Sequence, residues 1–193
     1  MQRPEPTEIW LIRHAPADAG GRLAGRRDVP LAALDPAVVA RARAALAAFG
    51  SPARVVTSPA RRCRDTASRL FPEAAATTDP RLWEQDFGAW DGADPASIPD
   101  LGPLPSAALA DHAPPGGESF SQLVARTAPA LADLAGPGPV AVVAHAGTVR
   151  AALTLALGTE GAGLAFSVAP LSLTRVTMLP GDTWAIGAVN LPL

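Results

Sequence analysis

The sequence contains no lysine, so all sixteen of its Lys and Arg positions are arginine. This absence excludes mechanisms that need a lysine Schiff base, a lysine general base or the lysine of a P-loop. Any anion binding must therefore use arginine. The single cysteine, Cys63, excludes a disulfide framework, a four-cysteine zinc site and a CxxC redox pair.

Long apolar runs are also absent, since no segment approaches the roughly 18 to 20 consecutive apolar residues of a membrane span. The segment from Met1 to Glu8 carries Arg3 and Glu5 and lacks the apolar core and cleavage site of a signal peptide. We therefore expect a cytoplasmic protein without a membrane partner. The net charge of -2 gives no reason to expect nucleic acid as a partner, and the oligomeric state stays open.

The 193 residues, 48% of them hydrophobic, fit a single domain over residues 1–193 that folds alone. Residues 91–118 carry six prolines and no arginine, and this composition predicts an irregular, cap-like excursion over the sheet. His112 in this excursion is interpreted as a solvated side chain, and Cys63 as a small, buried or half-buried helix residue. No metal site is expected.

Short apolar runs alternate with helical patterns along the chain. Strands are predicted at residues 9–12, 54–57, 140–144, 171–179 and 184–189, with an extended segment at 76–82, and helices at 36–49, 59–70, 119–134 and 148–157. This alternation predicts a three-layer α/β/α sandwich with a mostly parallel sheet, to which the closing pair of strands adds an antiparallel edge.

Polar side chains follow three of the predicted strands. Arg13 and His14 follow the first, Ser58 and Arg62 the second, and His145 the strand at 140–144. Ligands of an open α/β sheet bind outside the carboxyl ends of its strands, so these residues are candidates for one site. A neutral imidazole can attack phosphorus, and one guanidinium group can bind two phosphate oxygens in bidentate fashion. The pattern predicts phosphoryl transfer.

Phosphoryl transfer to a protein nucleophile also needs an acid for the departing alcohol. Glu84 lies between Trp83 and Phe87, where partial burial would favour its protonated form. The competing interpretation is a solvated loop carboxylate. In the same way, an Arg-His pair after a single strand is more often structural than functional, and only the combination of clusters favours a site.

These residues fall within segments that resemble the motifs of the histidine phosphatase superfamily, also called the phosphoglycerate mutase-like family. The similar segments are residues 11–14, 21–31, 57–67, 82–92, 116–119 and 143–150, in the family's order, and the likeness spans about residues 8–190. The resemblance implies the phosphoglycerate mutase-like fold and a phosphatase that needs no metal or other cofactor.

The resemblance also implies a role for each candidate. His14 is the implied nucleophile that becomes phosphohistidine, and Glu84 is the implied proton donor. Arg13, Arg62 and His145 are implied to hold the phosphoryl oxygens. Arg62 takes this role, and its neighbours Arg61 and Arg64 do not, because the family arginine lies four residues before the Thr-Ala pair of the motif.

The chain departs from the family pattern directly after His14. The family usually has glycine there, then a glutamate-threonine pair and a nearby asparagine, whereas this chain has Ala15 and Pro16 followed by Ala-Asp-Ala-Gly. Ala146 likewise stands where glycine or serine is common. These departures restrict the backbone beside His14 and remove two side-chain partners of the phosphate. They motivate an alternative, a catalytically impaired pseudophosphatase that binds phosphate esters.

The favoured prediction is a phosphomonoesterase that acts on a small phosphate monoester with a largely neutral leaving group. The excursion at 91–118 has no arginine for a second phosphate, which disfavours mutases, bisphosphatases and phytases. Among monophosphate phosphatases the motifs look most like the alpha-ribazole-5'-phosphate phosphatases of cobalamin synthesis. The alternatives are a broad-specificity phosphatase and a phosphoglycerate mutase-like enzyme.

Overall fold

The computed structural model describes residues 5–181 and 183–193. Arg3 of the predicted N-terminal segment lies outside the described residues. Across the described ranges, no helix has both the length and the apolar character that crossing a membrane requires.

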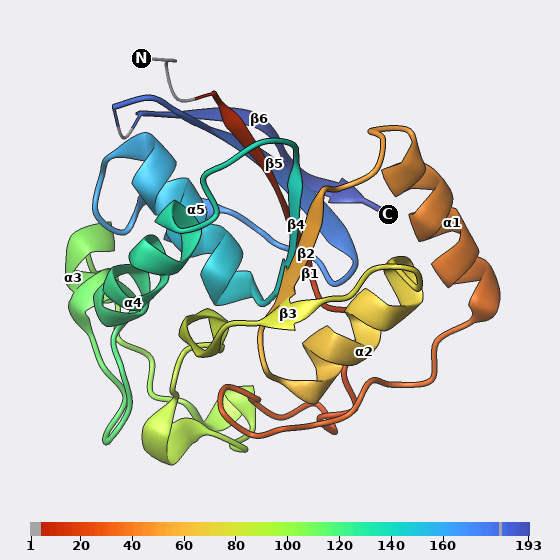
Figure 1. Cartoon of the computed structure of the whole chain (residues 1–193). Coiled ribbons are helices and arrows are strands. Elements are labelled where there is room, and N and C mark those ends of the chain that lie inside the picture. Colours follow the sequence, from red (N-terminus) through yellow and green to blue (C-terminus); the bar gives the residue numbers. More distant parts are fainter. Residues whose placement is uncertain (1–4, 182) are drawn as a thin grey trace.

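A six-stranded sheet in the order β3-β2-β4-β1-β5-β6 forms the centre of the fold (Figure 1). The strands are β1 (Thr7–Arg13), β2 (Arg54–Thr57), β3 (Thr77–Thr78), β4 (Val140–Ala144), β5 (Ser172–Leu179) and β6 (Thr183–Pro192). Strands β1 to β4 are parallel, whereas β5 pairs antiparallel with β1 and β6 antiparallel with β5. The predicted mostly parallel sheet with an antiparallel edge is thus confirmed.

Helices cover both faces of this sheet. They are α1 (Pro36–Ala47), α2 (Arg61–Leu70), α3 (Ser106–Asp111), α4 (Phe120–Ala132) and α5 (Ala146–Leu157), with short 3₁₀ turns at Pro80–Leu82, Gly88–Trp90, Pro95–Ser97 and Ala162–Ala165. Figure 1 shows α1 and α2 on one side of the sheet and the other three helices on the opposite side. The three-layer α/β/α prediction is therefore confirmed.

The sheet is buried on both faces because alternate residues of its central strands pack against different helices. In β1, Ile9 and Leu11 belong to the core shared with α4 and α5, whereas Trp10 and Ile12 belong to the core shared with α1 and α2. All four side chains are fully buried. Each contributes about 1.5 to 3 kcal/mol of transfer free energy, so the ends of β1 are held firmly in place.

Several predicted boundaries differ from the structure, and local contacts explain two of the differences. Helix α2 begins at Arg61 and not at residue 59, because the Ser58 hydroxyl accepts from the Ala60 N–H (3.2 Å) in a turn before the helix. The extended segment predicted at 76–82 is reduced to β3. Its second half forms a 3₁₀ turn, because the Asp79 carboxylate accepts from the Arg81 N–H (2.8 Å) and Pro80 favours the first position of such a turn.

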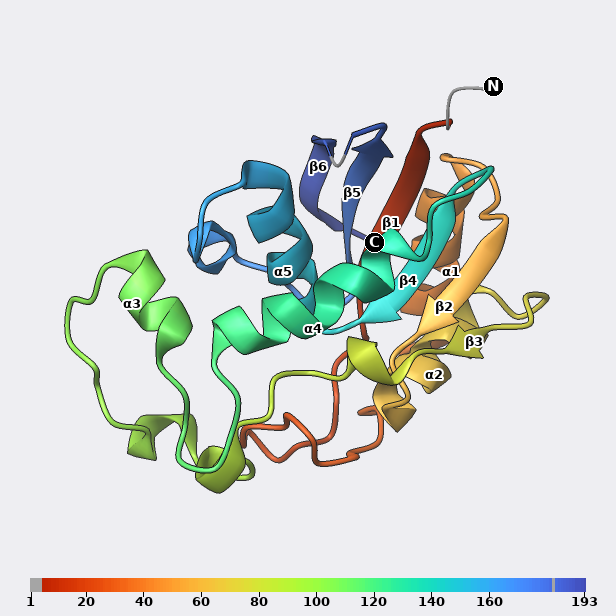
Figure 2. The same ribbon diagram turned by 60° about the vertical axis from the view of Figure 1, so that its left-hand side comes forward.

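Two long connections lie at the carboxyl ends of the parallel strands. Residues 14–35 follow β1, and residues 83–118 include the predicted excursion. Both views place these connections at the same end of the sheet (Figure 1, Figure 2). Backbone hydrogen bonds join them, for example from the Leu23 N–H to the Ala93 carbonyl (3.0 Å). The candidate residues at the strand ends therefore lie beneath a shared cover.

Candidate active site

His14 lies at the carboxyl end of β1, where its backbone N–H continues the pairing with β4 by donating to the Ala144 carbonyl (2.9 Å). The residue is 7% exposed, and its Nδ1 is 2.7 Å from the Ala15 carbonyl oxygen. Because a carbonyl oxygen can only accept, Nδ1 carries the hydrogen. In the neutral ring, Nε2 then carries the lone pair.

Burial, together with the nearby charges of Arg62 and Arg13, lowers the pKa of His14 from 6.5 to about 3, against the opposing effect of the hydrogen bond to Ala15. The ring is thus neutral at physiological pH. A neutral imidazole with a fixed Nδ1–H has the protonation state that a nitrogen nucleophile requires.

His145 caps the start of α5 and is fully buried. Its Nδ1 lies 3.3 Å from Arg62 Nη2, and its Nε2 lies 2.8 Å from the Ser58 hydroxyl. Since a guanidinium only donates, Nδ1 accepts and the Nε2–H donates to Ser58. Burial, together with the charge of Arg62, holds the pKa of His145 well below 6.5. Both ring nitrogens therefore face protein groups, and the ring stands edge-to-face with His14 at a centroid distance of 5.3 Å.

Arg62 is 1% exposed, whereas Arg61 and Arg64 are exposed on the surface of α2. Its guanidinium donates to the carbonyls of Arg27 (2.9 Å), Ala24 (3.1 Å) and Gly25 (3.0 Å). A buried cation needs such partners, because burial removes its hydration. The segment at 24–27 therefore fixes the guanidinium beside His145.

Asp91 holds this segment in turn, a role that the sequence analysis did not identify. Its carboxylate accepts from the backbone N–H groups of Gly25 (2.9 Å), Arg26 (2.9 Å) and Arg27 (3.0 Å). The only sequence signal was its place in the segment at 82–92. The position of Arg62 thus depends on a carboxylate 29 residues further along the chain.

Glu84 reaches the start of α5, where its Oε1 accepts from the N–H groups of Gly147 (3.2 Å) and Gln85 (2.9 Å). A Cβ on Gly147 would lie 2.2 Å from Oε1, so this approach requires glycine. The backbone before the carboxylate is held by Arg126, which donates to the carbonyls of Arg81 (2.6 Å) and Trp83 (3.1 Å). The sequence analysis did not identify Arg126.

One cavity of about 480 Å³ joins these groups, and its lining includes Arg13, His14, Arg62 and Glu84. His145 lies behind Arg62 and is not among the lining residues. Two further arginines line it, and the sequence analysis assigned neither: Arg22 and Arg150. Arg13 donates to the Val168 carbonyl (2.5 Å) and Arg150 to the Phe166 carbonyl (3.0 Å), so the chain after α5 positions both.

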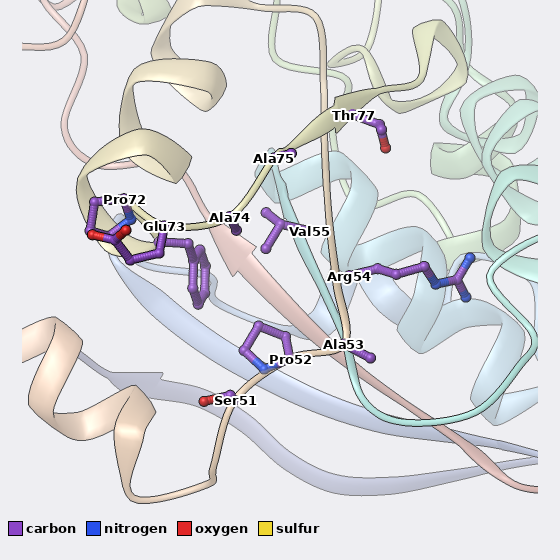
Figure 3. Close-up of a pocket in the computed structure, with 11 residues that line it drawn as sticks. Ser51, Pro52, Ala53, Arg54, Val55, Pro72, Glu73, Ala74, Ala75 and Thr77 are labelled. Atoms are coloured by element: carbon purple, nitrogen blue, oxygen red, sulfur yellow. The ribbon is translucent and has the colours of Figure 1, made fainter.

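A larger hollow of about 550 Å³ lies at the start of β2 and is lined mainly by residues 51–55 and 71–75 (Figure 3). Arg54 and Glu73 are its charged side chains, and no histidine lines it. The combination of an imidazole, guanidiniums and a carboxylate therefore belongs to the smaller cavity. In the described part of the chain, no group of three or more His, Cys, Asp or Glu side chains is arranged to hold a metal ion.

The departure from the family pattern after His14 leaves the backbone unstrained. Ala15 is fully buried and packs in the core between the sheet and α2, and it is not among the residues with a positive φ. Its N–H donates to the Thr66 hydroxyl of α2 (3.0 Å). Because the added methyl group faces the core, it does not enter the cavity, which Pro16 lines.

The family model of the histidine phosphatase superfamily (branch 1) matches residues 9–192, and the chain belongs to this family. The glucosyl-3-phosphoglycerate phosphatase of Mycobacterium tuberculosis is 34% identical over 169 residues, which cover 77% of this chain and 74% of that protein. A bifunctional protein of the same organism is 32% identical over 99% of this chain, and the chain spans only 54% of its length.

Solved structures show the same fold. A mycobacterial glucosyl-3-phosphoglycerate phosphatase superposes with a TM-score of 0.82 at 27% identity, covering 97% of this chain and all of that one. A candidate alpha-ribazole-5'-phosphate phosphatase from Escherichia coli superposes with a TM-score of 0.77 at 21% identity, covering 95% and 96% of the two chains. Family membership and the phosphatase relatives support the class of phosphoric monoester hydrolases.

The low pKa of His14 predicts a stability that depends on pH. The unfolded chain protonates this ring near pH 6.5 and the folded protein only near pH 3, so the unfolded state binds the extra proton between these values. The free energy of unfolding of the wild type therefore falls as the pH drops through this window. In His14→Asn the free energy of unfolding should fall less steeply with decreasing pH, and the difference between the two slopes should be about 1.4 kcal/mol per pH unit.

Urea unfolding at pH 8, 6, 5 and 4 in phosphate-free buffer measures this difference. Near pH 8 the free energy of unfolding should depend on pH equally in the wild type and in His14→Asn, because His14 is then unprotonated in both the folded and the unfolded state. Equal slopes between pH 6 and 4 would contradict the interpretation.

The contacts of Asp91 predict that Asp91→Ala lowers the free energy of unfolding by about 2 to 4 kcal/mol, because three backbone N–H groups lose a charged acceptor. Hydrogen exchange at the amides of residues 25–27 should accelerate. Asp94→Ala is the matched control, since among the described residues its carboxylate accepts only from the exposed Ala96 N–H. Equal losses in the two variants would show that Asp91 has no special role.

Proposed function

We propose that the protein hydrolyses a small phosphate monoester through a phosphohistidine intermediate. The observation that carries this proposal is the state of His14, a buried neutral imidazole whose Nδ1–H is bound to Ala15, in a cavity that also holds Arg13, Arg62 and Glu84. These are the nucleophile, the anion-binding groups and the acid that the reaction needs.

In the first step, the lone pair of His14 Nε2 attacks phosphorus and forms a P–N bond while the P–O bond to the alcohol breaks. Glu84 gives its proton to the departing oxygen. The guanidiniums of Arg13 and Arg62 stabilise the charge on the phosphoryl oxygens. In the second step, water loses a proton to the Glu84 carboxylate and attacks phosphorus, the P–N bond breaks, and inorganic phosphate leaves.

His145 acts in this proposal through its neighbours. Its Nδ1 accepts from Arg62 and its ring packs on His14, so it orients both groups. A direct hydrogen bond from His145 to a phosphoryl oxygen, which the family resemblance implies, requires the Nε2–H to leave the Ser58 hydroxyl. Ser58 is then the group that holds the ring when no phosphate is bound.

The relatives support phosphatase chemistry and leave the substrate open. A solved relative at 27% identity holds inorganic phosphate. The proposal of alpha-ribazole 5'-phosphate as substrate rests on the motifs, because the Escherichia coli neighbour at 21% identity supports the fold alone.

A second candidate substrate is glucosyl-3-phosphoglycerate, because the name of the relative at 34% identity contains it. Arg22 and Arg150 favour it, because they offer extra positive charge to a carboxylate.

The proposal treats residues 1–193 as one catalytic domain in which residues 91–118 form the cap. A cytoplasmic location is part of it. Because the chain spans about half of the bifunctional relative, the proposal concerns this domain's activity.

Replacing the nucleophile tests the proposal directly. With p-nitrophenyl phosphate, His14→Ala should reduce kcat/KM by at least about 10³-fold, because no other imidazole in the cavity can form the P–N bond. Wild type incubated with a ³²P-labelled ester and stopped in alkaline detergent should retain label that is stable in alkali and lost in acid, and His14→Ala should retain none. Wild type that binds phosphate without turnover would instead be the pseudophosphatase.

The proton donor predicts a dependence on the leaving group. Glu84→Gln should lower kcat/KM about 10²- to 10⁴-fold for an alkyl phosphate, whose alkoxide needs a proton, and much less for p-nitrophenyl phosphate, whose phenolate leaves unaided. Adding Gln85→Glu to the Glu84→Gln variant restores a carboxyl group one position away, and this double variant should not recover the lost rate. An equal loss on both esters would remove Glu84 from the acid role.

A further inference from the structure

The ion pair of Arg126 and Glu118 lies beside the segment that carries Glu84. Arg126 Nε donates to Glu118 Oε2 (3.2 Å), and Nη2 donates to Oε1. The two side chains are 19% and 16% exposed, so both charges have lost most of their hydration. A pair this buried needs further hydrogen-bond partners, because one ion does not replace all the water that the other has lost. Those partners show what the pair holds in place.

Arg126 finds its other partners in the backbone that leads to Glu84. Nη1 donates to the carbonyls of Arg81 (2.6 Å) and Trp83 (3.1 Å), and Nη2 donates to the carbonyl of Glu84 itself (3.4 Å). Together with the two bonds to Glu118, these contacts use all five N–H donors of the guanidinium. Because the donors of a planar guanidinium point in fixed directions, the backbone from residue 81 to residue 84 is held in one position relative to α4.

Glu118 holds the backbone on the other side of Glu84. Its Oε1 accepts from the Asp86 N–H (3.0 Å), and its own N–H donates to the Asp86 carbonyl (2.9 Å). Its carbonyl accepts from the Gln85 side-chain amide (2.8 Å). One ion pair thus fixes the chain directly before and directly after the Glu84 side chain.

The excursion brings Glu118 back to this point in the fold, because its two ends meet. Near the meeting point the Ala89 N–H donates to the Pro115 carbonyl (2.9 Å). The excursion is also packed within. His112 contradicts its interpretation as a solvated side chain, since it is partly buried and its ring stacks on Trp90 at a centroid distance of 5.8 Å. Glu118 therefore reaches the segment of the acid from a folded element.

We propose that Arg126 and Glu118 are positioning residues for the proton transfer from Glu84 to the departing alcohol oxygen. Neither lines the cavity that holds His14, so both act through Glu84 and not on the substrate. They set the point from which the Glu84 side chain extends to the start of α5. A displacement of about 1 Å in a reacting group costs ~10²-fold in rate, so this pair has a large effect on the step that needs the acid. The inference rests on the proposed function, because it requires Glu84 as the proton donor.

Two esters with different leaving groups test this inference. Arg126→Gln should lower kcat/KM about 10- to 10²-fold for ethyl phosphate, whose alkoxide needs the proton of Glu84. The loss for p-nitrophenyl phosphate should be at least about fivefold smaller, because its phenolate leaves unaided. Glu118→Ala should show the same selectivity. The ratio of the two kcat/KM values is measured on one preparation, so it does not depend on the fraction of folded protein.

Two further variants separate positioning from a general loss of stability. Arg126→Lys keeps the positive charge and has three donors, and it should recover part of the loss on ethyl phosphate. Arg175→Gln is the matched control, since it breaks a second arginine–glutamate pair, that of Arg175 with Glu8 between β5 and β1. This control should keep the wild-type ratio of the two esters.

A double variant tests whether Arg126 acts through Glu84. In the Glu84→Gln background no acid remains to be positioned, so adding Arg126→Gln should lower kcat/KM for ethyl phosphate by less than about threefold. A further loss as large as that in the wild-type background would show that Arg126 acts elsewhere, and would overturn the inference.

The two levels of the proposal fail in different ways. If Glu84→Gln is selective for ethyl phosphate and Arg126→Gln lowers both esters equally, the ion pair is only structural and the phosphatase proposal stands. If Glu84→Gln lowers both esters equally, Glu84 is not the acid and the positioning inference is overturned with that role. If wild type hydrolyses neither ester, the phosphatase proposal and the positioning inference are both overturned.

Discussion

The rest of the site depends on the buried guanidinium of Arg62. A cation at 1% exposure is costly unless every nearby acceptor is in place, and here three carbonyls of residues 24–27 and one imidazole nitrogen surround it. Asp91 shapes the segment that supplies those carbonyls. Burial lowers the pKa of both His14 and His145, and the charge of Arg62 lowers both further in the same direction. A single desolvated charge thus couples the backbone of two loops to the protonation state of two rings.

Much of this arrangement could be predicted from the sequence, because one rule covers it. Buried apolar runs marked three of the parallel strands, and the carboxyl ends of parallel strands share one edge, so the residues after each strand had to lie near one another. Strands β2 and β4 have the predicted bounds. Helix α2 was misplaced by two residues because the Ser58-Pro59 pair resembles a helix start, although its turn comes before the helix.

The supporting contacts could not be predicted in this way. Arg126 reaches backbone carbonyls more than 40 residues away, and carbonyls carry no sequence signal. The orientation of His145 depends on which acceptors surround its ring, which the strand pattern does not specify. His112 sits in a proline-rich stretch that is typical of solvent-exposed loops, and only the tertiary packing of the excursion against Trp90 buries its nitrogen. Local sequence pattern locates the candidate site residues, whereas long-range packing decides their environment.

The contact between Gly147 and Glu84 has a consequence for how far this domain can vary. The carboxylate occupies space that any other amino acid would fill with its first side-chain carbon, at 2.2 Å from Oε1. Even alanine at this position would push the carboxylate away from the start of α5. The position of the Glu84 carboxylate at the start of α5 therefore depends on the absence of a side chain at residue 147 of a neighbouring helix.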